Sequence, residues 1–145
     1  LQSCSAGVEK LCAIFTAHRP ASESVVVTNA KGVYGPVLAE HALFCCLHFS
    51  RRYPYFEANR QARLWQSFSP YSLRGQTLAI VGFGLSGLEI ARLAHAFGMR
   101  VEVLRSTLVD EMAKEEREEL IDRIVERGDL HSLLATADFV VSVRP

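Results

Sequence analysis

Apolar and polar positions in the second half of the chain fall into blocks that predict alternating strands and helices. Residues 77–81 and 100–104 are short apolar runs, as expected of strands buried in a parallel sheet. Between them, residues 88–97 place apolar side chains on one broad side of a helix and polar side chains on the other. Gly98 is placed to end that helix. Together these features predict a β-α-β unit.

The pattern continues toward the end of the chain. Residues 110–128 are dense in Glu, Arg and Lys, and an apolar stripe among them predicts a surface helix. Asp129 is expected to cap a short helix over residues 130–137, which leads into a strand at residues 138–143. The resulting order, β-α-β-α-α-β, predicts an α/β fold of the Rossmann type with a doubly wound parallel sheet. The apolar stripe consists of Leu120, Ile121, Ile124 and Val125.

The first half of the chain contains one candidate strand, at residues 25–28, and one strongly apolar helix. Pro36 suits the first turn of that helix, which is expected to run to Arg51. A helix that is apolar on most sides is buried between domains, between subunits or in a membrane. This one is shorter than the ~20 apolar residues of a membrane span and contains Glu40, so we expect no membrane helix.

Residues 51–71 mix aromatic and basic side chains. Such a mixture could form a surface for nucleic acid. However, Lys plus Arg equal Asp plus Glu at 16 each, so the whole chain is neutral, and it holds no nucleic-acid motif. We therefore favour a connecting helix packed by aromatic side chains and expect no nucleic-acid partner.

Three glycines follow the first predicted strand directly, in the run Gly82-Phe83-Gly84-Leu85-Ser86-Gly87. In a strand-turn-helix of this spacing Gly82 permits the tight turn. Gly84 lets the backbone approach a pyrophosphate, and Gly87 lets the helix pack closely on the strand. The pyrophosphate would rest on the N–H groups at the start of the helix. We interpret the segment as a dinucleotide-binding turn rather than an ordinary glycine-rich loop.

The residues after the second strand bear on the choice of nicotinamide cofactor. An NAD site usually has an Asp or Glu there, which accepts a hydrogen bond from the adenosine ribose 2′-hydroxyl. This chain has Arg105, Ser106 and Thr107 instead. A guanidinium can bind a 2′-phosphate with two hydrogen bonds, whereas it gains little from a hydroxyl. A solvated Arg at a strand end is the alternative, but we expect NADP(H) to be preferred, with NAD(H) possible.

Length and cysteine content add little to this interpretation. A chain of 145 residues is long enough for one domain with its own core. It begins with Leu1 and stops at Pro145 directly after an apolar run, from which we expect a fragment of a longer protein. The cysteines match no zinc or redox spacing, which favours a reduced, cytoplasmic setting. They are Cys4, Cys12, Cys45 and Cys46.

No residue of this chain is assigned a catalytic role. Hydride transfer to a carbonyl group needs a general acid within hydrogen-bond reach of the substrate oxygen. His18 and His131 have no paired carboxylate at a telling spacing, and His95 is expected to be a solvated residue on the polar face of its helix. His41 and His48 share a face of one predicted helix and could hold a metal across two subunits. Packing and hydrogen bonding explain that spacing with fewer assumptions, so we predict no metal site.

Several segments in order resemble the D-isomer-specific 2-hydroxyacid dehydrogenases, the group that includes glyoxylate/hydroxypyruvate reductases and phosphoglycerate dehydrogenases. Their order and spacing agree over nearly the whole chain, which is far more specific than the glycine turn alone. The matching segments are residues 5–9 (SAGVE), 27–33 (VTNAKGV), 37–41 (VLAEH), 73–77 (LRGQT), the glycine turn, and 133–141 (LLATADFVV).

The resemblance implies a division of the chain into three parts. Residues 1–35 would be the tail of a flavodoxin-like substrate domain. Residues 36–72 would form interdomain and dimerisation helices, which implies a homodimer. Residues 73–145 would be an NAD(P)-binding Rossmann domain that is incomplete at its C-terminus.

The resemblance also implies site residues. The backbone at Ala6 and Gly7 would line the carboxylate end of a pocket for a 2-keto or 2-hydroxy acid. Val143, Arg144 and Pro145 would border the nicotinamide half of the cofactor.

Within the glycine turn, Leu85 stands where the family often has an Arg, so phosphate contact would rely on the backbone and on Ser86. The family's catalytic Arg and His–Glu pair would lie beyond the segment that ends at Pro145.

Three hypotheses follow for function. The leading one is a partial chain of an NADP(H)-preferring 2-hydroxyacid dehydrogenase, most like a glyoxylate/hydroxypyruvate reductase and expected to be inactive by itself. The second is a binding module whose association responds to a nicotinamide cofactor, with the helix at residues 36–51 as its dimer surface. The third is an inactive truncated remnant. Likeness of fold alone does not separate them.

Overall fold

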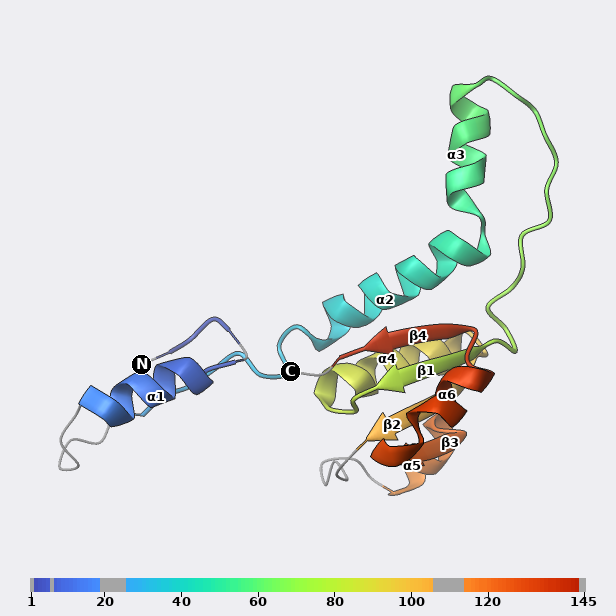
Figure 1. Ribbon diagram of the computed structural model, residues 1–145. Helices are drawn as coiled ribbons and strands as arrows, with labels where there is room; N and C mark the ends of the chain where they lie inside the picture. The colour runs from blue at the N-terminus through green and yellow to red at the C-terminus, as the bar shows by residue number, and fades with distance from the viewer. Residues whose placement is uncertain (1, 6, 19–25, 106–113, 144–145) are drawn as a thin grey trace. The chain divides into compact units, whose positions relative to one another are not determined.

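The computed structural model describes residues 2–5, 7–18, 26–105 and 114–143. Its elements in chain order are α1 (Glu9–His18), α2 (Gly35–Ser50), α3 (Tyr53–Gln61), β1 (Thr77–Val81), α4 (Leu85–Ala96), β2 (Arg100–Arg105), α5 (Lys114–Leu120), β3 (Arg123–Glu126), the 3₁₀ turn η1 (Arg127–Asp129), α6 (Leu130–Thr136) and β4 (Phe139–Ser142) (Figure 1).

The chain separates into two compact units, one that comprises residues 1–34 and one that comprises residues 35–144. In the first unit the predicted strand at residues 25–28 is wrong as far as it is described, because Thr28 makes only one isolated bridge, to Gln2. A strand needs a partner strand along several residues, and a single bridge does not supply one. Assignment of this unit to a substrate domain stays a prediction.

The second unit is built on a four-stranded parallel sheet in the order β3-β2-β1-β4. The chain runs outward from β1 to β2 and β3, and then returns to place β4 on the other side of β1. This arrangement confirms the predicted Rossmann-type α/β fold. It also creates a point, between β1 and β4, where the strand order reverses.

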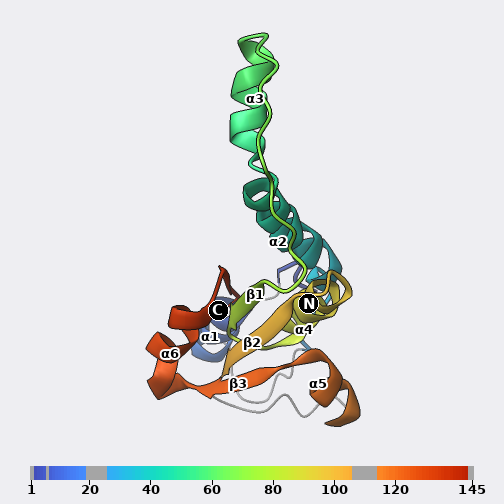
Figure 2. The same ribbon diagram turned by 90° about the vertical axis from the view of Figure 1, so that its right-hand side faces the viewer.

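Helices cover both faces of this sheet, with α4 and α6 on opposite sides (Figures 1 and 2). Successive residues of a strand point to opposite faces, so neighbours in β1 enter different cores. Leu78 and Ile80 pack with α2 and α4, whereas Ala79 packs with Leu133 of α6. All four side chains are fully buried. The sheet is therefore doubly wound, as predicted.

The predicted helix at residues 110–128 is wrong in its second half. The helix α5 ends at Leu120, and residues 123–126 form the edge strand β3, which pairs in parallel with β2. The element order from β1 is therefore β-α-β-α-β-α-β. Leu120, Ile121, Ile124 and Val125 do recur at helical spacing, but pairing with the exposed edge of β2 overrides that local preference. In the strand Val125 is buried and Ile124 is exposed.

Two aspartates fasten the amino ends of neighbouring strands. The Asp122 carboxylate accepts a 2.7 Å hydrogen bond from the backbone N–H of Val101, at the start of β2. The Asp138 carboxylate accepts one of the same length from the N–H of Thr77, at the start of β1. Asp122 directly precedes β3 and Asp138 directly precedes β4, so the two contacts join β3 to β2 and β4 to β1.

The apolar helix predicted from Pro36 is α2, and it packs along α4. Its other sides are not buried within this chain, since the side chains of Phe44 and Phe49 are 61% and 62% exposed. The predicted connecting helix in residues 51–71 is confirmed only as α3, and the segment that follows runs back beside it (Figure 1). None of the helices in the described part of the chain is both long and apolar enough to cross a membrane.

Candidate functional site

The glycine turn joins the carboxyl end of β1 to the start of α4. Gly82 has a φ of +92°, a left-handed conformation that favours glycine, which confirms its predicted role in the tight turn. At Gly87 a Cβ atom would lie 3.0 Å from the Gly82 carbonyl oxygen and 3.2 Å from the Phe83 ring. The close packing of helix on strand expected at Gly87 is therefore confirmed as well.

Gly84 differs from the other two glycines of the turn. It is exposed, and a Cβ atom built on it would meet nothing within 4 Å. Its φ of −112° is open to any residue, so neither strain nor packing in this chain requires glycine here. Space beside the backbone is what the approach of a pyrophosphate needs, and a side chain would fill it.

The start of α4 offers hydrogen-bond donors at the same place. The first bond along this helix runs from the Leu88 N–H to the Gly84 carbonyl, at 2.9 Å. The backbone N–H groups of Leu85, Ser86 and Gly87 therefore have no acceptor inside the helix. Together with the positive end of the helix dipole, such groups bind anions well.

This turn lies at the strand-order reversal of the sheet. Gly82 donates its N–H to the Leu104 carbonyl of β2 at 2.9 Å, which holds the turn beside the carboxyl end of the neighbouring strand. On the other side, the Val143 N–H donates to the Val81 carbonyl at 3.0 Å. In open α/β sheets this crevice, outside the carboxyl ends at the reversal point, is where ligands bind. The structure thus brings the glycine turn and Val143 to one edge.

The residues predicted to select the cofactor begin at the last residue of β2. Arg105 is the last residue of that strand, in register with Glu126 of β3. Glu102, two positions past the start of the strand, faces α6 and accepts a hydrogen bond from Thr136 at 2.8 Å. This confirms that the Glu102 carboxylate points away from the face of Val101 and Val103.

Several predicted site residues are not placed by the structure. Ser106, Thr107, Arg144, Pro145 and Ala6 lie outside the described residues. Gly7 is described and exposed, in the first unit, where a Cβ atom would lie 3.1 Å from the Glu9 carboxylate. Their roles toward a substrate or cofactor stay predictions.

One contact between reactive side chains was missed by the sequence reasoning, which paired His41 with His48. The Cys45 Sγ lies 3.7 Å from Nε2 of His41, one helical turn earlier on α2. The i, i+4 spacing could have pointed to it. The adjacent Cys46 is buried against the core, and burial raises the pKa of its thiol to about 11, with the neighbouring Cys45 adding to the effect.

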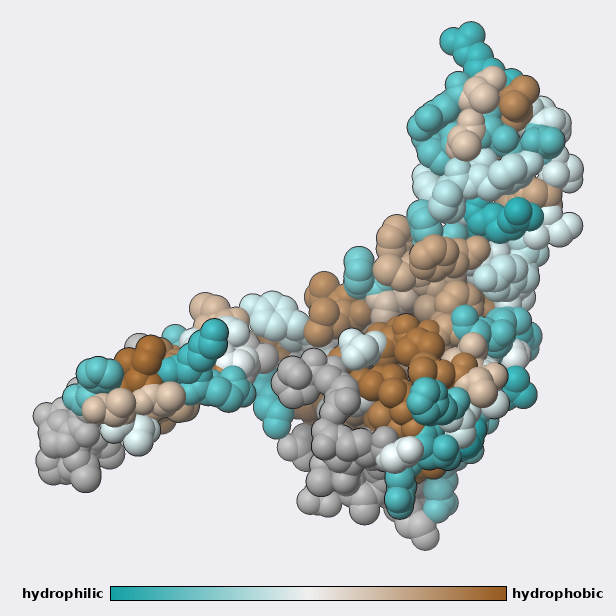
Figure 3. Space-filling view, viewed as in Figure 1, coloured by the Kyte–Doolittle hydropathy of each residue, from teal (hydrophilic) through white to brown (hydrophobic). Residues whose placement is uncertain are grey.

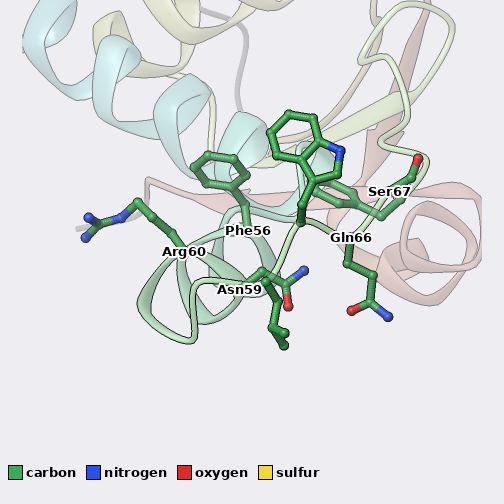
Figure 4. A pocket seen from close by; sticks show the side chains of 8 residues that line it. Phe56, Asn59, Arg60, Gln66 and Ser67 are labelled. Atoms are coloured by element: carbon green, nitrogen blue, oxygen red, sulfur yellow. The ribbon is translucent and has the colours of Figure 1, made fainter.

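A separate cavity of about 380 Å³ lies between α3 and the segment that follows it. Phe56 and Asn59 border it from α3, and Gln66 and Ser67 from the returning segment (Figure 4). Among the described residues, the Asn59 Nδ2 is buried without a hydrogen-bond partner. Trp65, which also lines this cavity, is fully exposed. No lining residue belongs to the glycine turn.

The charged side chains of α3 are paired with one another. The Arg60 guanidinium donates to both oxygens of Glu57, at 2.8 and 2.6 Å, and Gln61 donates a third hydrogen bond. The bonds from Arg60 and then from Gln61 lower the pKa of the Glu57 carboxyl to about 2. This carboxylate stays charged throughout the physiological range and is no candidate for proton transfer.

Comparison with known proteins identifies the family. The sequence model of "D-isomer specific 2-hydroxyacid dehydrogenase, NAD binding domain" matches residues 43–145, which include the whole sheet and the glycine turn. The chain belongs to this family. The resemblance seen in the sequence segments is therefore confirmed, and the glycine turn lies within the part of the chain that matches the NAD-binding domain.

The relatives agree with this assignment. A glyoxylate reductase of Thermococcus litoralis is 33% identical over 125 residues, which are 80% of this chain and 36% of the relative. A D-3-phosphoglycerate dehydrogenase of Bacillus subtilis is 37% identical over 92 residues, which are 62% of this chain and 18% of the relative. The chain thus spans about a third or less of the length of these relatives.

A solved structure shows the same fold. The crystal structure of a D-isomer specific 2-hydroxyacid dehydrogenase family protein from Aeromonas salmonicida superposes with a TM-score of 0.77 at 30% identity. The match covers 99% of this chain and 43% of that protein.

Proposed function

We propose that this chain is the cofactor-binding part of an oxidoreductase that reduces a small 2-keto acid, of the glyoxylate or hydroxypyruvate type, to the 2-hydroxy acid. The observation that carries the proposal is the glycine turn, with its open space at Gly84 and its free N–H groups at the start of α4. Family membership and the glyoxylate reductase among the relatives support the substrate class.

The residues present fit a nicotinamide dinucleotide. The N–H groups of Leu85, Ser86 and Gly87 would hold the pyrophosphate, and the Ser86 hydroxyl could add a donor. Val143, Arg144 and Pro145 would border the nicotinamide ring, which supplies the hydride of the reaction when the cofactor is bound. Ala6 and Gly7 would contact the substrate carboxylate. No residue of this chain is proposed to transfer a proton, so this chain alone is proposed to be inactive.

The preferred cofactor is proposed to be NADP(H). Arg105 ends β2 where an NAD site commonly has an acidic residue, and Ser106 and Thr107 follow it with neutral donors. A guanidinium pairs with a 2′-phosphate through charge-assisted hydrogen bonds that a ribose hydroxyl cannot match.

Titration of the purified chain with NADPH and with NADH tests both proposals. We expect NADPH to bind more tightly, and Arg105→Asp to reverse the order by weakening NADPH selectively. Arg74→Asp is the matched control, because Arg74 is exposed and precedes β1, at the amino end of the sheet. Equal affinities that Arg105→Asp leaves unchanged would refute the NADP(H) preference. No binding of either cofactor by a folded chain would refute the binding function itself.

We also propose that the protein is a homodimer through α2 and the region of α3. Support comes from the apolar side chains that this chain leaves exposed there, among them Phe44, Phe49 and Trp65. Figure 3 shows apolar surface gathered over α2 and β4. Light scattering during size-exclusion chromatography should give twice the chain mass, and Phe44→Glu should give a monomer. A wild-type chain that is monomeric at all concentrations would contradict the proposal.

Assembly measurements also address the second hypothesis, a cofactor-responsive binding module. If added NADPH shifts the monomer–dimer equilibrium, association is linked to the cofactor by that difference in affinity. If the assembly state does not change when the cofactor is added, the result counts against the binding module, and the oxidoreductase stays the proposed function.

A further inference from the structure

The side of α2 that faces away from the core carries a regular stripe of four side chains. They follow one another at intervals of four, three and four residues and are Val37, His41, Phe44 and His48. Residues at these spacings share one face of a helix. The buried residues of α2 lie on the opposite side; they are Gly35, Ala39, Ala42, Leu43, Cys46 and Ser50. In the single chain Val37 and Phe44 are 64% and 61% exposed, so the stripe is open there.

The spacing of this stripe is the one by which two helices pair. Alternating steps of four and three residues keep a row of side chains along one seam, where each side chain enters a gap between side chains of the facing helix. Along the stripe the apolar Val37 and Phe44 alternate with His41 and His48. A seam of this composition can pair closely only when its imidazoles are uncharged.

Charge favours a second copy of this chain as the facing helix. Glu40, which lies outside the stripe, is the one Asp, Glu, Lys or Arg residue of α2. In a two-fold symmetric contact the same patch meets itself, so a fixed charge on it would meet a like charge. A stripe without fixed charge fits that arrangement. A charged partner would leave its own charges buried and unpaired against it.

The two histidines of the stripe stand among aromatic rings. The centroid of the Phe44 ring lies 6.3 Å from that of His41 and 6.1 Å from that of His48. A second copy laid over the stripe would close this row off from water. Removal from water disfavours the charged form of an imidazole, because apolar surroundings do not solvate the charge.

No described carboxylate is paired with His41. The group nearest to its Nε2 is the Cys45 thiol at 3.7 Å, which can donate to the neutral ring. The α4 and β4 residues that line the groove beside His41 carry no titratable side chain. Glu40 is adjacent in sequence, but consecutive side chains of a helix do not face each other. None of the ion pairs between described residues includes a histidine.

The surroundings of His48 add repulsion rather than a counter-charge. Its ring lies 5.6 Å from the Tyr53 ring of α3 and packs edge-on against Phe49 at 5.4 Å. The charged residues that follow it along the chain are two cations, Arg51 and Arg52. A proton taken up by either histidine would therefore stay uncompensated in the contact.

We propose that protonation of His41 and His48 separates the homodimer, so that the outer stripe of α2 is an acid-sensitive contact between two copies of this chain. The inference rests on the homodimer proposed above. An unperturbed imidazole takes up its proton near pH 6.5. The dimer binds fewer protons than two separate chains, so association is strongest above that pH and weakens as the pH falls through it.

The test is the dissociation constant of the full chain, measured by sedimentation equilibrium at about pH 8 and about pH 5.5. One unit below its own titration, each histidine that must stay neutral in the dimer weakens association by up to about tenfold. We expect at least that increase in the dissociation constant of the wild-type chain. His41→Gln combined with His48→Gln keeps the stripe neutral and should remove the increase. His95→Gln combined with His131→Gln is the matched control, because both residues are exposed elsewhere, and it should keep the increase.

A second measurement needs no substitution. In a proton NMR titration, His41 and His48 should take up their protons at a lower pH in a concentrated sample than in a dilute one. His95 and His131 should show no such difference.

The outcomes separate the switch from the homodimer itself. A wild-type chain that is monomeric at pH 8 would refute the homodimer and the switch with it. A wild-type dimer with the same dissociation constant at both pH values would refute the switch alone. So would an increase that persists in the His41 and His48 double variant, or histidine titrations that do not depend on concentration. Circular dichroism at both pH values should show the same helix content, and its loss at pH 5.5 would assign the effect to unfolding and overturn the proposal.

Discussion

The Gly82 carbonyl oxygen lies 3.0 Å from the position that a Cβ atom would occupy at Gly87. That contact joins the two ends of the glycine turn, because Gly82 follows β1 and Gly87 lies in the first turn of α4. A backbone oxygen cannot rotate away as a side chain can. The distance between helix and strand therefore depends on the absence of a side chain at position 87.

Gly87→Ala should accordingly destabilise the fold. We expect a loss of about 1–3 kcal/mol in the free energy of unfolding, as for other overpacked sites, together with weaker cofactor binding. Gly84→Ala is the informative partner, since its Cβ would meet nothing within the chain. It should lower cofactor affinity while leaving stability nearly unchanged. Urea denaturation and cofactor titration of both variants measure the two effects. Equal stability loss in both would contradict the packing argument.

Asp122 gives a prediction about the sheet. Its carboxylate accepts the Val101 N–H, so Asp122→Ala would leave a backbone donor at the start of β2 without that acceptor. We expect a loss of about 1–3 kcal/mol, and a smaller loss in Asp122→Asn, which keeps an oxygen at that place. Glu119→Ala, on the exposed side of α5, serves as the control and should fall within about 0.5 kcal/mol of wild type. Thermal or chemical denaturation measures the free energy of unfolding of all three variants. A wild-type value for Asp122→Ala would show that this hydrogen bond does not stabilise the fold.

The Glu57–Arg60 pair predicts a pH dependence. Hydrogen bonds from Arg60 and Gln61 lower the pKa of Glu57 from 4.5 to about 2 in the folded chain. Because the folded pKa is the lower one, any stabilisation by this pair is fully present above pH 4.5 and disappears as the pH falls through about 2. Carbon-detected NMR titration should show Glu57 titrating near pH 2. In Arg60→Gln the titration midpoint of Glu57 should move back toward 4.5. An unchanged midpoint would show that Arg60 does not lower the pKa of Glu57.

The cysteines should differ in reactivity. Cys46 is 3% exposed, and burial raises the pKa of its thiol to about 11, so little thiolate is available near neutral pH. Cys4 and Cys12 are exposed. Alkylation followed by peptide mass spectrometry should label Cys4 and Cys12 first and Cys46 last. Denaturant should remove the difference, whereas fast labelling of native Cys46 would mean that α2 does not pack against the core as described.

Much of the nucleotide-binding unit was predictable from local sequence. The runs that became β1 and β2, the amphipathic helix between them and the three glycines each express their structure within a few residues. The strand, turn and helix patterns all predict the same β-α-β unit, and agreement between independent local signals makes a prediction secure. The motif also predicted the tight turn at Gly82 and the close packing of α4 on β1 at Gly87.

The edge strand β3 could not be predicted in this way. Ile124 and Val125 continue the spacing of Leu120 and Ile121, so the local pattern favours a helix. What decides the matter is distant in sequence: β2 offers an unpaired edge, and Asp122 accepts the Val101 N–H to start the pairing. The candidate strand at residues 25–28 shows the converse, because Thr28 forms an isolated bridge to Gln2 and the described residues around it form no strand.

Residue types at fixed short spacings were enough to predict the fold class, the position of the glycine turn and the family. The strand order, the hydrogen bond from Val143 to the end of β1, the exposure of α2 and the contact between Cys45 and His41 are seen only in the folded chain. Burial and pairing depend on which distant segments become neighbours. The sequence pattern shows which segments prefer helix or strand locally. Only the folded sheet shows which of these preferences are satisfied.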